Sequence, residues 1–328
     1  NLIGCGAGGT LAEGREIEEG PGVVVWAASL PGAEVTTMHV TAEREAGDFR
    51  LLGIPEEFGA EGAPAADQAL ILLCDPYSFP SEVLLDALER ARPGAPVLGG
   101  LASAAFAGGT VLLRDGDVHA GGAVGALLSG VQVLPCVSQG ATPVGPEMTI
   151  TAAEANLVGE LASKPAIERL GEVIASLPEE ERVLARGGVL LGLVVDENRP
   201  EHQRGDFLVR PIIGADRDSG ALAIGERVRV GQTVRLHVRD AASADADLRE
   251  ALRAQAHALG SGGAAGALLF TCNGRGSHMF DVPDHDAAAI EDSLGAPAAG
   301  FFCAGEIGPV GGRNFLHGFT ATMAVFPA

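Results

Sequence analysis

Apolar runs that break at glycine- or cysteine-rich turns recur along the chain, each followed by a similar order of elements. In the clearest copy the helix opens at Pro283–Asp286 and stops at Gly295, as proline near a helix start and glycine after its end favour. This copy predicts a strand, a turn, a helix, a second strand, a second turn and a closing strand at 267–270, 271–276, 283–295, 300–303, 304–309 and 317–326.

Two further copies lie upstream. The middle of the chain predicts a strand, a helix, a second strand and a closing hairpin at 69–73, 81–92, 96–98 and 110–128. The opening of the chain matches only the later part of the unit, since 1–9 resembles the second strand with its turn and 23–30 the closing strand. No counterpart of the first strand and helix is found, and no initiator Met, so we expect the chain to lack its native amino terminus.

The regions between the copies are less regular. A helix is predicted over 151–178, where Thr151 and Glu154 have the spacing of a capping box, and another over 244–259. Four strands are predicted at 188–195, 206–213, 221–224 and 233–239. Strands interspersed with helices and closed by hairpins indicate an α/β (α+β) protein with mixed β-sheets flanked by helices. We predict two related domains built from the repeated unit, at 1–150 and 151–328.

Charge narrows the classes of partner. The chain has 43 acidic and 22 basic residues and a formal net charge of −21, with a single lysine, Lys164. Phosphate binding needs clustered basic side chains, so neither nucleic acid nor an anionic membrane surface is expected as a partner. No apolar stretch reaches the length of about 18 residues that a membrane span needs. We therefore expect a cytoplasmic protein.

Cysteine and histidine usage argues against disulfides and metals. The five cysteines are odd in number and widely spaced, which is typical of reduced thiols. No Cys-x-x-Cys and no paired histidine spacing occurs, so no metal site is predicted. The run Gly4–Gly9 fits G-x-G-x-x-G, but a charged, glycine-broken segment follows it and the next strand ends without an acidic residue. We therefore expect no cofactor, and assign these glycines to tight turns.

The last copy carries the candidate chemistry. Cys272 and Cys303 could be nucleophiles, with His278, His285 or His317 as base, although buried cysteines at strand ends are common packing. Arg275, in a glycine-flanked loop ahead of a helix, could hold an anion such as a carboxylate. Glu306 follows a strand expected to be buried, and could recognise a cationic or donor-rich ligand.

Longer motifs resemble a known family. The runs Leu269–Gly276, His285–Asp286 and Ala299–Pro309 resemble the C-terminal FIST domain, as do Phe207–Arg210 and Val238–Ala241. The first half resembles the N-terminal FIST domain at Gly4–Cys5, Ile71–Asp75, Val97–Gly100 and Ser138–Gly145. The resemblance implies an intracellular sensory module of signal transduction, found in bacteria alone or joined to signalling domains, that binds small ligands such as amino acids.

We therefore predict a sensor for a small-molecule ligand, such as an amino acid or similar metabolite, with a signalling protein as a further partner. Its ligand-binding residues are predicted to be Cys272, Asn273, Gly274, Arg275, Gly276, Phe302, Cys303, Gly305 and Glu306. Two alternatives stay open: an enzyme that uses Cys272 or Cys303, and a protein-interaction scaffold with a vestigial pocket. No catalytic residue is assigned.

Overall fold

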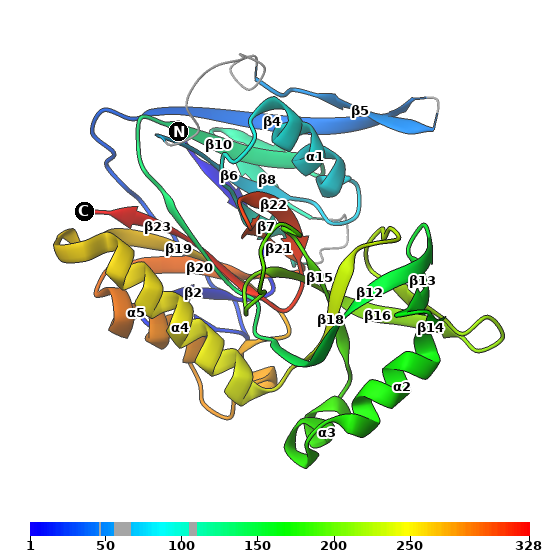
Figure 1. The fold of residues 1–328 in the computed structure, drawn as a ribbon. Helices are drawn as coiled ribbons and strands as arrows, with labels where there is room; N and C mark the ends of the chain where they lie inside the picture. Colours follow the sequence, from blue (N-terminus) through cyan, green and yellow to red (C-terminus); the bar gives the residue numbers. More distant parts are fainter. Residues whose placement is uncertain (46, 56–66, 105–109) are drawn as a thin grey trace. The chain divides into compact units, whose positions relative to one another are not determined.

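The computed structural model describes residues 1–45, 47–55, 67–104 and 110–328. These residues form two compact units, unit 1 with residues 1–138 and 248–328 and unit 2 with residues 139–247. The fold is α+β with mixed sheets, as the sequence predicts (Figure 1). Within the described residues, no helix is long and apolar enough to cross a membrane.

The first large sheet of unit 1 contains the second copy of the repeat. Helix α1 (Ser81–Ala91) connects two parallel strands, with Leu70 opposite Val97, and the closing strand runs antiparallel to the first. The sheet order is β22 (Arg313–His317), β21 (Glu306–Val310), β7 (Val97–Leu101), β6 (Gln68–Cys74), β10 (Ala123–Ser129), β4 (Glu34–Glu45) and β5 (Asp48–Leu52).

The second large sheet contains the third copy. Helix α5 (His285–Leu294) connects two parallel strands, and Gly295 ends it in the left-handed conformation that the sequence predicts. The sheet order is β11 (Leu134–Ser138), β23 (Ala321–Pro327), β19 (Ala264–Cys272), β20 (Ala298–Cys303), β2 (Thr10–Ala12) and β3 (Arg15–Ile17). A small third sheet has the order β1 (Ile3–Cys5), β8 (Leu112–Arg114) and β9 (Asp117–His119).

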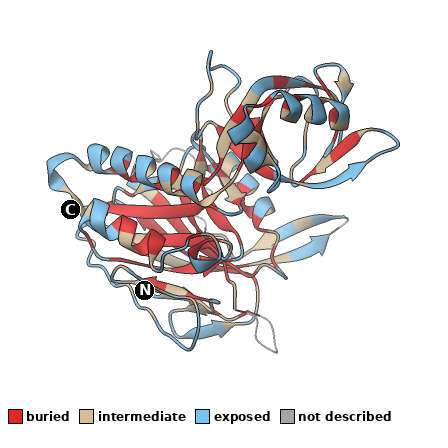
Figure 2. Ribbon diagram, turned by 90° about the horizontal axis from the view of Figure 1, so that it is seen from below, coloured by how far each residue is buried: buried red, intermediate tan, exposed pale blue. Residues whose placement is uncertain are grey.

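The central strands of unit 1, such as β6 and β23, are buried on both faces, which explains why they read as continuous apolar runs. In β6, Ile71 and Leu73 join the cluster shared with Phe270 of β19, whereas Leu70 and Leu72 join the cluster under α1. The two large sheets therefore meet face to face. Helix α1 covers the outside of one sheet, and α5 and α4 (Ala241–Leu259) cover the outside of the other, with their outer faces exposed (Figure 2).

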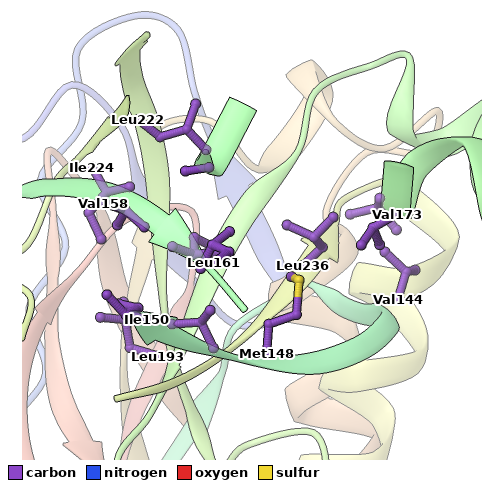
Figure 3. Close-up of a cluster of buried hydrophobic side chains, with 14 of the residues drawn as sticks. Val144, Met148, Ile150, Val158, Leu161, Val173, Leu193, Leu222, Ile224 and Leu236 are labelled. Atoms are coloured by element: carbon purple, nitrogen blue, oxygen red, sulfur yellow. The ribbon is translucent and has the colours of Figure 1, made fainter. Parts of the chain in front are cut away.

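Unit 2 is a single sheet that closes on itself, because its first strand also pairs with the sixth in the order. That order is β12 (Thr142–Glu154), β18 (Thr233–Val238), β15 (Leu190–Val194), β16 (Phe207–Asp216), β17 (Ala221–Ile224), β13 (Leu157–Leu161) and β14 (Lys164–Pro165). Helices α2 (Ala166–Ser176) and α3 (Glu179–Ala185) follow β14. Its core of aliphatic side chains includes Ile150, Leu161, Leu193 and Leu236 (Figure 3).

The predicted helix over 151–178 is wrong in its first half. Residues 151–154 belong to β12 and 157–161 to β13, and only 166–176 are helical. A turn with Ala155 at φ 51° lets the two strands pair, and the Thr151 hydroxyl bonds Glu160 rather than capping a helix. Cross-strand packing thus overrides the local helix signal.

Other predicted strand limits also need correction. The turn predicted at 304–309 is largely the strand β21, which pairs with β7 of the other sheet. The closing strand predicted over 317–326 is divided between β22 and β23. Residues 23–30 form no strand, and residues 110–128 give the hairpin β8–β9 followed by β10 in another sheet.

The three copies all lie in unit 1. The boundary predicted at 150 falls inside β12, within unit 2. Proximity in space has therefore joined the two ends of the chain into one unit, with unit 2 inserted between them in the sequence.

Candidate functional site

The loop after β19 is anchored by a buried ion pair. Arg275 and Asp286 are both fully buried, and the guanidinium donates from Nε to Oδ2 at 2.7 Å and from Nη2 to Oδ1 at 2.8 Å. The Thr271 hydroxyl donates to the same carboxylate at 2.7 Å, and His285 Nδ1 lies 2.9 Å from Oδ1. Burial alone would raise the pKa of Asp286, but these partners, Arg275 foremost, hold it below its usual range.

This pairing gives Arg275 a structural task. Two of its nitrogens bind Asp286 at the start of α5, so the guanidinium fastens the loop 273–276 to that helix. The Arg275 guanidinium also lies over the ring of Phe280, 5.2 Å from its centroid. The imidazole of His285 stacks on the same phenyl ring, with 3.5 Å between the ring centroids. These contacts anchor the loop to the first turn of α5.

Glu306 presents a buried carboxyl group with one oxygen poorly satisfied. Its Oε2 accepts hydrogen bonds from the N–H and the hydroxyl of Thr320, at 3.0 and 2.9 Å. Oε1 is buried and accepts no hydrogen bond within the described residues, although the weakly donating thiol of Cys272 is near enough to affect the carboxyl group. Burial raises the pKa of Glu306 to about 8, more than Thr320 and Cys272 lower it.

Cys272 lies beside this carboxyl group, close to the surface. The N–H of Gly274 donates to its Sγ at 3.4 Å, and burial followed by the charge of Glu306 raises the pKa of the thiol to about 11. The ring of Phe319 covers the loop, since a Cβ on Gly274 would lie 2.7 Å from Phe319 Cε1. Phe319 is 44% exposed and has a φ of 65°, which is unfavourable for a bulky residue.

The other predicted site residues divide between core and loop. Phe302 and Cys303 are buried, and burial raises the pKa of the Cys303 thiol well above its usual value. Asn273 is exposed, and its N–H donates to the carbonyl of Cys303 at 2.9 Å. Gly276 and Gly305 make close approaches: a Cβ would lie 2.8 Å from the Glu18 carboxyl carbon at Gly276 and 3.0 Å from Leu101 at Gly305.

Sequence reasoning missed the residues that complete this cluster. Asp286 and Thr320 supply the partners of Arg275 and Glu306, and Phe319 supplies the cover. Glu16 of β3 also reaches the cluster, because its carboxylate accepts the N–H groups of Asp286 and Ala287 at 2.9 and 3.1 Å. Burial, then the charge of Asp286, raises the pKa of Glu16 to about 7. Of these residues, only Asp286 could have been suspected from the local sequence, because it lies in the first turn of a predicted helix.

The second repeat has a buried carboxylate at the end of β6, the strand that corresponds to β19. Asp75 follows β6 directly and is 2% exposed. It accepts hydrogen bonds from the Ser78 N–H at 2.9 Å and from the hydroxyls of Ser78 and Thr110. Burial alone would raise the pKa of Asp75, yet these bonds lower it below its usual value. Asp75 is thus fully used in holding its own turn.

Two cavities elsewhere in unit 1 lie away from the predicted residues. One, of about 10 Å³, is lined by Leu70, Leu88, Arg92 and their neighbours under α1. The other is an open surface groove lined by residues that include Pro96, Pro135 and Pro309. Within the described part of the chain, no group of three or more His, Cys, Asp or Glu side chains is placed to hold a metal ion.

Comparison with known proteins identifies two matching families, which between them span most of the chain. The FIST N domain matches residues 1–164, and the FIST C domain matches residues 166–309. An uncharacterized protein of Mycobacterium tuberculosis strain H37Rv is 46% identical over 327 residues, which are 99% of this chain and 83% of that protein. An uncharacterized protein of Mycobacterium bovis is 45% identical over 327 residues, covering 99% and 82%.

Proposed function

Because this chain belongs to the FIST family and carries both its N and C domains, we propose that it senses a small donor-bearing ligand at the ends of β19 and β20. FIST domains are associated with sensory modules of signal transduction. The ligand class proposed is an amino acid or a related amine, and the output passes to a signalling protein partner.

The buried carboxyl group of Glu306 carries the proposal. A buried polar atom without a good partner is costly, so such a group is retained where a ligand or a reaction uses it. Oε1 of Glu306 can accept a hydrogen bond from a strong donor. An ammonium group would supply that donor together with a positive charge that compensates the carboxylate. The Asp75 carboxylate of the second repeat, whose hydroxyl and N–H donors are all in place, lacks this property.

The surrounding residues take supporting parts. Arg275, bound to Asp286, positions the loop 273–276, so we assign the acidic end of an amino acid to the side-chain amide of the exposed Asn273 in that loop. Phe319 covers Gly274 in an unfavourable backbone conformation, and its displacement would open the way to Glu306. Such a movement also gives the sensor two states for a partner to distinguish.

Thiol catalysis receives less support from the same geometry. A nucleophilic cysteine acts as the thiolate, whose population falls as the pKa rises. Burial raises the pKa of Cys272 to about 11 and that of Cys303 well above its usual value, so both are protonated thiols at neutral pH.

The test is a thermal-shift and calorimetric screen of amino acids, simple amines and organic acids at millimolar concentration. We expect an amino acid or amine to raise Tm, and expect its binding by Glu306 to release a proton, which calorimetry in two buffers of different ionisation enthalpy detects. Glu306→Gln should abolish binding, whereas the matched control Asp75→Asn should preserve it. The proposal fails if no amine stabilises the protein, or if Glu306→Gln binds as tightly as the parent.

A further inference from the structure

Three equivalent hydrogen bonds show that the repeats of unit 1 exchange their hairpins in a ring. The hairpin β21–β22 of the third repeat joins β7 of the second, where Leu101 N–H donates to Gly305 O at 2.8 Å. The hairpin β2–β3 of the first joins β20 of the third, where Phe302 N–H donates to Gly9 O at 3.0 Å. The hairpin β8–β9 of the second joins β1 of the first, where Gly6 N–H donates to Val111 O at 2.8 Å.

In the second and third repeats the strand that receives a hairpin has a parallel neighbour on its other side, but in the first repeat the described residues provide none. β7 has the parallel strand β6 on its other side, and β20 has β19. The strands β6 and β19 pair in turn with the closing strands β10 and β23. In the described residues, β1 pairs only with β8, and the segment 23–29, at the position of a closing strand in sequence, forms no backbone hydrogen bond.

The segment 23–29 exposes its side chains unevenly. Burial alternates over residues 23–26, where Trp26 packs on Phe326 at 4.9 Å between ring centroids and against the central core. Val23 and Val25 point the other way and are 90% and 80% exposed. A segment that packs one side chain on the core and leaves its N–H and C=O groups without backbone partners offers those groups to another strand.

The hairpin β8–β9 differs from the other two hairpins in its helix contacts. Helix α1 packs on β22 and α5 packs on β3, so each complete repeat places a helix over the second strand of a neighbouring hairpin. The corresponding strand here is β9, where Val118 is 70% exposed, and Leu2 beside β1 is 50% exposed. Isolated exposed apolar residues are ordinary, but Leu2, Val23, Val25 and Val118 all belong to, or lie next to, the elements at which the repeat predicts a strand and a helix.

We infer that the open edge, defined as β1 with residues 23–29, binds a strand–helix segment like β6–α1 and β19–α5. The strand would lie between the two parts of the open edge, parallel to β1 and antiparallel to 23–29, and the helix would cover Val25 and Val118. The helix would be connected to β1 by a short loop, as α1 is connected to β7. The M. tuberculosis relative has the length for it, since the part that matches this chain is 83% of that protein.

The occupant has a definite chemistry. The strand is apolar on both faces, as in β6 and β19, because it would face the central core on one side and a helix on the other. The helix is amphipathic, as α1 is, with leucines at the spacing of one buried face.

The experiment fuses a donor copy of residues 67–96 of this chain, which holds β6 and α1, directly ahead of Asn1. A second fusion uses residues 263–297, which hold β19 and α5. In at least one fusion, we expect the amides of 23–29 to exchange with solvent at least about tenfold more slowly than in the parent, with a higher Tm. The matched control carries Leu72→Asp in the donor copy alone and should lose this protection.

Val25→Asp provides an independent arm. In the parent the side chain is largely exposed, so Tm should not change; in the protective fusion the new charge would lie under the helix, and Tm should fall. The inference is overturned if neither fusion protects 23–29 or if the Leu72→Asp donor protects equally well. It is also overturned if the parent protects 23–29 by self-association that depends on protein concentration, because a second copy would then be the occupant.

Discussion

The second and third repeats of unit 1 both bury a carboxyl group near the carboxyl ends of their parallel strands, but they satisfy it to different degrees. Asp75 accepts from Ser78 and Thr110, and its pKa falls below the usual range although burial alone would raise it. Glu306 accepts from Thr320 on one oxygen, and burial raises its pKa to about 8. The same scaffold therefore produces a structural carboxylate in one copy and an uncommitted carboxyl group in the other.

The difference lies in how many of the carboxyl oxygens receive a hydrogen bond from the described residues: both in Asp75 and one in Glu306. Ser78 is three residues from Asp75, so a local turn closes around that carboxylate. Thr320 comes from the far side of a hairpin, and the remaining charge near Glu306, Arg275, is bound by Asp286. Comparing the two copies teaches that a site is recognised by what is left unsatisfied rather than by burial alone.

The largest expected effect concerns the ion pair that holds the third repeat's loop. Asp286→Ala leaves the Arg275 guanidinium buried without its carboxylate, and should lower the free energy of unfolding by about 3–5 kcal/mol. Denaturant titration measures the change. The double variant Arg275→Met with Asp286→Leu should recover much of the loss. A cost below about 1 kcal/mol for Asp286→Ala would show that the pair does not anchor the loop.

The thiols provide the second measurement. Since burial raises the pKa of Cys272 to about 11 and that of Cys5 to about 12, native labelling at pH 8 should be about 100-fold slower than labelling of the unfolded chain. Mass spectrometry of labelled peptides gives the rate at each of the five cysteines. Labelling of all five in denaturant is the control. A native Cys272 that reacts at the unfolded rate would revive the enzyme alternative.

The third prediction separates Glu306 from the other carboxyl groups by pH. Its folded pKa of about 8 is above the ordinary 4.5, so the stability it contributes is complete below pH 4.5 and is lost as pH rises through 8. Between pH 7 and 8 the parent should lose up to about 1.4 kcal/mol, and Glu306→Gln should lose little. Glu16→Gln is the control, because the Glu16 pKa of about 7 confines most of its effect to lower pH. Equal slopes in parent and Glu306→Gln would contradict the assignment.

The smallest effect belongs to the second repeat. Asp75→Asn weakens the hydrogen bonds from Ser78 and Thr110 and should cost about 1 kcal/mol at neutral pH. Because the pKa of Asp75 is lowered in the fold, its contribution is present above pH 3.8 and disappears as pH falls through the folded value. Urea titration at pH 7 and pH 3 checks both points. A cost that persists undiminished at pH 3 would mean that packing, not charge, is responsible.

Sequence patterns located the elements better than their partners. The strand β19, the helix α5 and its glycine stop follow from an apolar run, a proline-led first turn and Gly295, all of which act within a few residues. Glu306 was recognised from its place after a buried strand, and the structure does bury it. Its assignment to a turn failed because β21 is formed by pairing with β22 and with β7, and β7 lies some 200 residues earlier in the sequence.

What the sequence determined by itself is the repeated unit and the family, since both rest on short-range patterns of apolar residues, glycines and cysteines. Tertiary structure alone decided that the repeats exchange hairpins, that Asp286 binds Arg275 and that Glu16 reaches α5. Contacts between residues as much as 270 apart have no local signature, because they depend on which surfaces meet once each element has formed.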